Sequence, residues 1–203
     1  MLLGTAFAMG LLIFRVYLSG SLEFVFLSWN LFLAWIPWLI AAALVRYDQM
    51  PWLLVGGAAL WLLFFPNAPY IVTDLFHLRP RNGVPQWYDL ILIVSFAWTG
   101  LLLGLSSLRD MQRLLFDRLG RYWSGLVATA ILFLSAFGVY LGRYGRWNSW
   151  DLFTRPHVLL GDVVDPVFAP GENLGVVGFT LCFGGLLLLL FLTFAGWNQP
   201  RES

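Results

Sequence analysis

The stretch Phe65-Pro66-Asn67-Ala68-Pro69-Tyr70-Ile71-Val72-Thr73-Asp74-Leu75-Phe76-His77-Leu78 interrupts an apolar run with two prolines and an asparagine. The apolar run from Trp52 to Phe65 would span only about 21 Å as an α-helix, which is short of a membrane core of roughly 30 Å. Either the helix continues past both prolines, or the chain reaches the membrane surface early. Broken helices at membrane depth are tolerated where they line protein or water. We therefore predict a broken third span, with polar chemistry gathered near the break.

The composition points to an integral membrane protein. Of the 203 residues, 60% are hydrophobic and 11% are charged, whereas an average soluble domain carries about 25% charged residues. Several apolar runs are long enough to cross a bilayer as helices. We predict an all-α, polytopic membrane helical bundle with about six transmembrane helices, the third broken near Pro66–Pro69. Residues 1–203 form one membrane domain, with spans at roughly 2–18, 24–45, 52–66, 87–108, 123–142 and 174–195.

The distribution of arginines predicts an orientation. Loops 46–51 and 109–122 and the tail from 196 share one side and carry six arginines in 28 residues, while 19–23, 66–86 and 143–173 carry five in 57. The denser side is expected to be cytoplasmic. We therefore predict a protein of the plasma (inner) membrane with both termini cytoplasmic. Arg15, near the end of the first span, is expected to extend its head group to the interface.

Bulk charge says which partners to expect. The formal net charge is +1, so nothing favours a nucleic acid. Membrane lipids are the expected partners, and self-association into a homo-oligomer is left open.

The pattern Gly100-Leu-Leu-Leu-Gly104 predicts close helix packing.

Polar residues of several segments share the side opposite to the arginine-dense loops, because spans alternate in direction. If residues 70–81 form an α-helix, Tyr70, Asp74, His77 and Arg81 lie on one face. An amide as deep as that of Asn30 should face other helices rather than lipid. We predict a polar cluster on this side, which His157 joins on one interpretation. The candidates for binding a ligand or lipid headgroup are Asn30, Asn67, Arg143, Arg146 and Asn148.

The ionisable residues of this cluster allow several chemistries. Catalytic candidates are His77, Asp74, Asp89 and Asp151. Asp74, His77 and Asp89 could hold a divalent metal that activates water for hydrolysis. Without a metal, His77 could act as a base oriented by Asp74. In a transporter, Asp74 and Asp89 could carry protons.

A structural interpretation competes with these chemistries. The tryptophans and tyrosines suit an aromatic belt at the membrane interface. The acids would then pair with arginines only to neutralise charge, with Arg79, Arg143 and Arg146 as partners of Asp74, Asp89 and Asp151. The break at Pro66–Pro69 is what this interpretation explains least.

Four motifs carry a resemblance to a known family: Trp29-Asn-Leu-Phe-Leu-Ala-Trp-Ile-Pro37, Pro66-Asn-Ala-Pro-Tyr-Ile-Val-Thr-Asp-Leu-Phe-His77, Trp87-Tyr88-Asp89, and Gly142-Arg143 with Arg146-Trp-Asn-Ser-Trp-Asp151. Over about residues 24–195 the chain resembles a family of bacterial integral membrane proteins that is defined as a domain of unknown function. The resemblance implies a bacterial inner-membrane location and a single membrane domain. It implies no reaction, ligand or catalytic residue.

The sequence thus favours a multi-pass membrane protein that binds a ligand or lipid headgroup through a polar cluster on one membrane face. A metal-dependent hydrolase or transferase acting on a lipid-linked substrate is the first alternative. A small transporter component is the second. Whether the chain is an enzyme, and which molecule it handles, is left open by the sequence.

Overall fold

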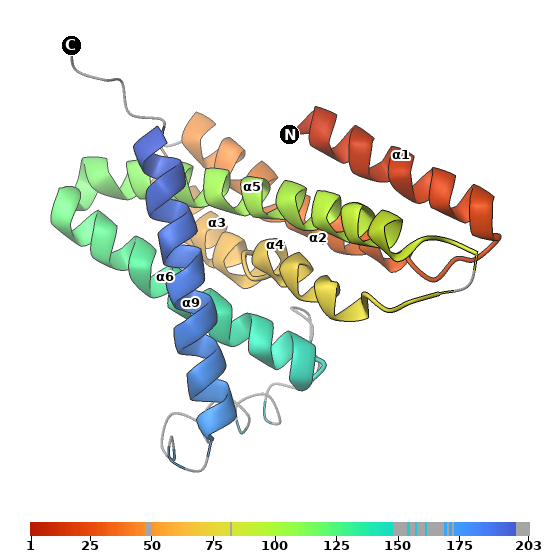
Figure 1. Ribbon diagram of the computed structural model, residues 1–203. Coiled ribbons are helices and arrows are strands. Elements are labelled where there is room, and N and C mark those ends of the chain that lie inside the picture. Colours follow the sequence, from red (N-terminus) through yellow and green to blue (C-terminus); the bar gives the residue numbers. More distant parts are fainter. Residues whose placement is uncertain are drawn as a thin grey trace. The chain divides into compact units, whose positions relative to one another are not determined.

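The described part of the chain is helical (Figure 1). The computed structural model describes residues 1–47, 50–81, 83–147 and 173–197, together with positions 154, 157, 161, 169 and 171. Over these residues the only β-type pairing is an isolated bridge between Arg81 and Val84. The all-α prediction is therefore confirmed. The elements are α1 (Leu2–Ser19), α2 (Phe26–Arg46), α3 (Pro51–Phe64), α4 (Asn67–Tyr70), the 3₁₀-helix η1 (Ile71–His77), α5 (Gln86–Leu119), α6 (Arg121–Tyr144) and α9 (Leu174–Trp197).

Within the residues that the structure describes, six helical segments are long and apolar enough to cross a membrane. Length and hydropathy together carry this assignment, because a bilayer core takes about 20 predominantly apolar helical residues. The prediction of about six membrane helices is confirmed. The segments are Leu2–Ser19, Phe26–Arg46, Trp52–His77, Gln86–Leu119, Arg121–Tyr144 and Leu174–Ala195.

The third span is interrupted at its prolines without leaving helical conformation. α3 ends at Phe64, and a turn at Phe65 and Pro66 leads into α4. The backbone stays in the right-handed helical region, with φ of −54° at Phe65 and −59° at both Pro66 and Ile71. Each proline lacks the N–H that would bond to the preceding turn, which accounts for the interruption. Of the two alternatives for this stretch, the helix continues past both prolines and runs to His77.

The chain divides into two compact units, Met1–Ser107 and Leu108–Ser203, with the division inside α5. The core of the first unit is built from side chains of α1, α2, α4, η1 and the first part of α5. Gly100 and Gly104 lie where α5 meets α4: a Cβ on Gly104 would be 2.9 Å from the Ala68 Cβ, and one on Gly100 would be 3.1 Å from the Ala68 carbonyl oxygen. The close packing predicted for these glycines is confirmed.

In the second unit, α6 packs against α9. Aromatic rings line this contact: the ring centroids of Tyr140 and Phe179 are 5.7 Å apart, and those of Tyr144 and Phe179 are 5.9 Å apart. Where Gly184 of α9 faces Phe133 of α6, an added Cβ would lie 2.6 Å from the ring. The contact is apolar and contains no charged side chain among these residues.

Candidate functional site

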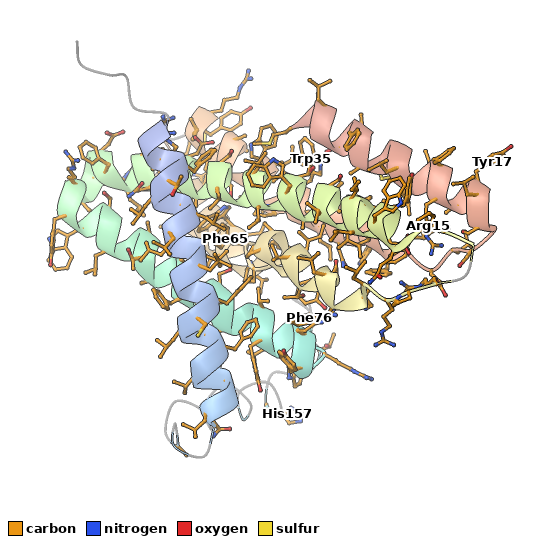
Figure 2. The ribbon with its side chains drawn as sticks, in the orientation of Figure 1. Arg15, Tyr17, Trp35, Phe65, Phe76 and His157 are labelled. Carbon is orange, nitrogen blue, oxygen red and sulfur yellow. The ribbon has the colours of Figure 1, made fainter. Side chains whose placement is uncertain are left out.

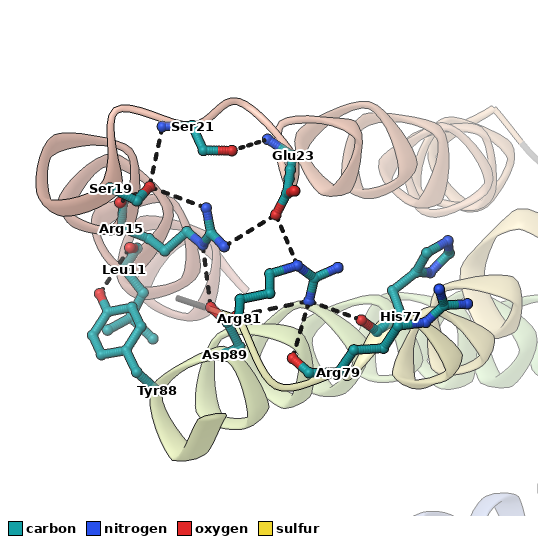
Figure 3. Close-up of polar contacts among 10 residues, drawn as sticks. All are labelled: Leu11, Arg15, Ser19, Ser21, Glu23, His77, Arg79, Arg81, Tyr88 and Asp89. Atoms are coloured by element: carbon teal, nitrogen blue, oxygen red, sulfur yellow. Dashed lines mark hydrogen bonds and ion pairs between the residues drawn. The ribbon is translucent and has the colours of Figure 1, made fainter. Parts of the chain in front are cut away.

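Polar side chains meet at one end of the first unit, which we call the interfacial end. It is formed by the end of α1, residues 20–25, the start of α2, residues 71–85 and the start of α5. The turn after α1 and the loop before α5 lie together there (Figure 1). Two groups of contacts occupy this end. The arginine cluster consists of Arg15, Glu23, Arg81 and Asp89 (Figure 3), and the Asp74 site consists of Asn30, Asp74 and His77.

Arg15 is the buried member of the arginine cluster that comes from α1. Its side chain is about 2% exposed, and its Nε donates a hydrogen bond to Asp89 Oδ1 at 3.1 Å. Nη1 donates to Ser19 Oγ at 3.1 Å and Nη2 to Glu23 Oε2 at 3.4 Å. The Arg15 head group finds its acceptors inside the protein, and its predicted extension to the membrane interface stays a prediction. Figure 2 shows the contrast with Tyr17, which points away from the other helices.

Arg81 reaches the same carboxylates from the loop before α5. Its Nε lies 2.7 Å from Glu23 Oε2, and its Nη1 lies 3.8 Å from Asp89 Oδ2. Nη1 also donates to the carbonyl oxygens of His77 at 3.1 Å and Arg79 at 3.4 Å. A tight turn holds the loop, with Gly83 at φ 87°, a conformation that glycine adopts at little cost. The short loop thereby fixes the guanidinium over the site.

Phe24 places the two guanidinium groups side by side. Its ring is fully buried, and the Cζ atoms of Arg15 and Arg81 each lie 4.6 Å from its centroid. A guanidinium at this distance over an aromatic face gains a cation–π attraction that is larger where water is excluded. The ring therefore favours two cations at a point where they would otherwise repel one another.

The two carboxylates of the arginine cluster differ in access to solvent. Asp89 is fully buried in the first turn of α5, whereas the Glu23 side chain is 54% exposed. Tyr88, beside Asp89, donates from its hydroxyl to the Leu11 carbonyl at 2.8 Å and so ties α5 to α1. Asp89 pairs with Arg15 and Arg81 rather than with the arginines we predicted as neutralising partners. One carboxylate is thus part of the core, and the other is exposed.

The Asp74 site lies next to the arginine cluster. The Asp74 side chain is 1% exposed, and its Oδ2 accepts a hydrogen bond from Asn30 Nδ2 at 2.7 Å. His77 Nδ1 lies 3.9 Å from Asp74 Oδ1, and the His77 side chain is 38% exposed. The ring of Phe26 packs against the imidazole at a centroid distance of 4.8 Å. The prediction that Asn30 faces other helices is confirmed.

The predicted face of Tyr70, Asp74, His77 and Arg81 does not form as an α-helical stripe. η1 is a 3₁₀-helix, in which residues three apart eclipse one another, so Ile71, Asp74 and His77 follow one row. Ile71 and Asp74 are both buried. The helix ends at His77, and Leu78 is extended with ψ 107°. Arg81 reaches this region by folding back onto the His77 carbonyl, not by helical periodicity.

The other predicted binding residues occupy different places. Asn67 Nδ2 donates to the Phe64 carbonyl at 2.9 Å and so bridges the break in the third span. Arg143 lies in the last turn of α6, and Arg146 follows it with φ 56°; both belong to the second unit, as does His157. Asn148 and Asp151 lie outside the described residues. The predicted convergence of these side chains with the interfacial end stays a prediction.

A metal site receives no support from the geometry. Among the residues that the structure describes, no group of three or more His, Cys, Asp or Glu side chains gathers as a metal site would require. Asp74 and His77 belong to one set of contacts, and Asp89 belongs to the other.

Sequence reasoning missed Glu23 and Arg15 as members of the site. A signal was present: Glu23 is the first acidic residue of the chain and Arg15 the one charge of the first span. With alternating spans, positions 15, 23, 81 and 89 all fall on one side. Two positive and two negative charges on one side predict pairing, but not which carboxylate is buried.

Comparison with known proteins gives a family but no relative of known function. The family model described as "Protein of unknown function (DUF1361)" matches residues 29–190. No curated protein and no solved structure matches the chain.

Proposed function

We propose that this chain, which belongs to the DUF1361 family of proteins of unknown function, is a multi-pass membrane protein that binds an anionic headgroup at the arginine cluster. The ligand chemistry is a phosphate or carboxylate group. The source that fits a site at the end of membrane helices is a lipid or a lipid-linked molecule. Such a group would meet Arg81 first and Arg15 behind it.

One observation carries this proposal: two guanidinium groups share an exposed carboxylate. Glu23 Oε2 lies 2.7 Å from Arg81 Nε and 3.4 Å from Arg15 Nη2. The cluster thus already contains a position for an anion between two arginines. Guanidinium groups are suited to phosphate and carboxylate because their N–H donors match the oxygens of these groups.

Glu23 is the member of the cluster that can leave this position. Its side chain is 54% exposed, whereas the Arg15 and Arg81 side chains are 2% and 22% exposed. Asp89, in contrast, is fully buried and stays with Arg15. When Glu23 turns to water, one guanidinium charge is left without its exposed partner, and an external anion can replace the carboxylate. We therefore assign Glu23 the role of an internal competitor for the ligand.

The cellular setting completes the proposal. We place the protein in the bacterial plasma membrane, with both termini in the cytoplasm, because loops on the side of the termini carry the denser arginines. The interfacial end then faces away from the cytoplasm. Membrane lipids are the partners at this end. No residue is assigned a catalytic role.

The test is lipid binding to the purified protein in nanodiscs of neutral phosphatidylcholine, with phosphatidylglycerol added as the anionic lipid. Native mass spectrometry would count the retained anionic lipids. Arg81→Gln should lower retention, and Glu23→Gln should raise it because the internal competitor is gone. Arg79→Gln is the matched control, since Arg79 is an exposed arginine two positions away.

Two results would overturn the proposal: equal effects of Arg81→Gln and Arg79→Gln, or no gain in Glu23→Gln. Added inorganic phosphate separates the two sources of the anion. Competition by phosphate alone, with no preference for phosphatidylglycerol, would assign the site to a free anion instead of a lipid.

A further inference from the structure

We propose that the arginine cluster selects a headgroup that carries a primary ammonium beside its phosphate, as phosphatidylethanolamine does. This inference rests on the proposed function and names the lipid class for the same site. Three features carry it: the charge balance of the cluster, the donors and acceptors around Arg81 that are not in use, and the exposure of Glu23.

The first step concerns charge. Arg15 and Arg81 bring two positive charges, and Glu23 and Asp89 bring two negative ones, so the cluster is neutral as it stands. A phosphate that entered alone would make the site negative, and both carboxylates would repel it. A headgroup that combines a phosphate with an ammonium adds no net charge. The balance therefore favours a headgroup whose phosphate is accompanied by a cation.

The second step concerns the donors that the phosphate would use. Arg81 Nε and Arg15 Nη2 lie 2.7 Å and 3.4 Å from the same oxygen, Glu23 Oε2 (Figure 3). Arg81 Nη1 donates to two backbone carbonyls, whereas its Nη2 donates no hydrogen bond among the described residues. A phosphate in the position of the Glu23 carboxylate would thus meet both guanidinium groups and gain the N–H donors of Nη2.

The third step concerns an acceptor that is not in use. Asp89 Oδ2 is buried and accepts no hydrogen bond from the described residues, and Arg81 Nη1 lies 3.8 Å from it. A buried carboxylate oxygen without a donor is costly. A small movement of Arg81 toward Asp89 would supply that donor, so Arg81 keeps a carboxylate partner when Glu23 leaves. The contact between Arg81 and Glu23 is therefore the one that a ligand can open.

The fourth step concerns Glu23 after it has left. Its side chain is 54% exposed, and its carboxylate would then lie beside the bound phosphate without a cation. In an ethanolamine headgroup a short carbon link joins the phosphate to an ammonium. A primary ammonium has three N–H donors, and a carboxylate accepts them in charge-assisted hydrogen bonds. Glu23 would thus exchange its two arginines for the ammonium of the same ligand.

The experiment uses the full chain in nanodiscs of equimolar phosphatidylethanolamine and phosphatidylcholine with matched acyl chains. Native mass spectrometry counts each retained lipid. Both headgroups carry the same phosphate and one positive charge, but the choline nitrogen has no N–H donor. We expect the wild type to prefer phosphatidylethanolamine about tenfold, the low end of what a hydrogen bond to a charged group contributes.

Glu23→Gln should remove most of this preference. Loss of the internal competitor affects both lipids alike, because their phosphates are the same, whereas loss of the carboxylate affects only the lipid with N–H donors. Arg79→Gln is the matched control and should keep the preference, since Arg79 is an exposed arginine whose side chain lies outside the cluster.

Equal retention of the two lipids by the wild type would overturn the inference, as would an unchanged preference in Glu23→Gln. Stronger retention of phosphatidylglycerol than of phosphatidylethanolamine from an equimolar mixture would also overturn it, in favour of a purely anionic lipid. Displacement of the bound lipid by free phosphoethanolamine at equal concentration would overturn the lipid as the source. The proposed function fails separately, because it depends on the loss of both lipids in Arg81→Gln and not on their ratio.

Discussion

Arg15 and Asp89 form a buried ion pair between residues of two membrane helices, with 3.1 Å between Nε and Oδ1. Replacing Asp89 by leucine should lower the free energy of unfolding by about 3 kcal/mol, because removing one partner leaves a buried charge uncompensated. The double variant Arg15→Met/Asp89→Leu should recover most of the loss, since no buried charge remains. Unfolding in mixed detergent and sodium dodecyl sulfate would measure both variants.

The exposed pair of Arg113 and Asp110 supplies the control. Its atoms are 3.8 Å apart, and the Arg113 side chain is 65% exposed. Arg113→Gln should therefore change the free energy of unfolding by less than about 0.5 kcal/mol. If Asp89→Leu is as mild as this control, the pair in α1 and α5 contributes no special stability.

Asn30 and Asp74 are the second pair whose energy can be isolated. Asn30→Ala removes the 2.7 Å hydrogen bond, and interhelical hydrogen bonds in membranes contribute on average about 0.6 kcal/mol, with a maximum near 1.7. We expect a value toward the upper end, because the acceptor is a buried carboxyl. A double-mutant cycle with Asp74→Asn would give the coupling energy. A coupling near zero would show that the two side chains do not stabilise one another.

For single residues, the sequence predicted that a polar side chain inside a span faces protein, but it did not predict which residue that side chain contacts. Asn30 was expected to face protein because an amide inside a span needs a hydrogen-bond partner. The burial of Arg15 was not foreseen, because a position near the end of a span suits both an arginine that reaches water and one that pairs inside. Which of the two Arg15 does depends on its hydrogen bond to Asp89, which is 74 positions away. No local sequence pattern predicts a contact between residues so far apart.

At the scale of the elements, α5 and α4 pack closely at glycine residues of α5. A Cβ on Gly104 would lie 2.9 Å from the Ala68 Cβ, so Gly104→Ala should lower the free energy of unfolding by about 1–3 kcal/mol through overpacking. Gly10→Ala in α1 is the matched control, since nothing lies within 4 Å of its added Cβ. It should be neutral or stabilising by up to about 1 kcal/mol through helix propensity. Equal effects in the two variants would contradict close packing at Gly104.

The third span shows how much of an element's structure its local sequence pattern predicts. Two prolines predicted an interruption, which the turn at Phe65 and Pro66 confirms. The faces after the break were predicted with 3.6 residues per turn, whereas η1 repeats every three. The sequence carries no signal for this change of period that we can name. Because of the three-residue period of η1, Asp74 lies in the same row as Ile71 and is buried with it.

For the molecule as a whole, six helices that all cross the membrane would put both termini on one side of it. Reporter domains fused at either end should therefore report the same compartment, and cysteines placed at Ser21 and Gly83 should react from the opposite side. Thiol labelling of intact and permeabilised cells would measure this. Opposite results for the two ends would mean that one of the six helices does not cross.

Fold class and helix number were predictable at this scale, because apolar length is a property of each segment by itself. For the site, the sequence predicted only that polar residues gather on one side of the membrane. Which side chains meet there depends on how the helices pack, and the matching family is of unknown function and so points to no ligand.

The buried pair of α1 and α5 also bears on how the chain is made. Arg15 enters the membrane 74 residues before Asp89 is synthesised, a delay of about 4 to 15 s at 5–20 residues per second. Glu23 follows Arg15 by only eight positions and can neutralise it within the first hairpin. The exposed carboxylate of Glu23 would thus neutralise Arg15 during synthesis, until Asp89 has been made and pairs with Arg15.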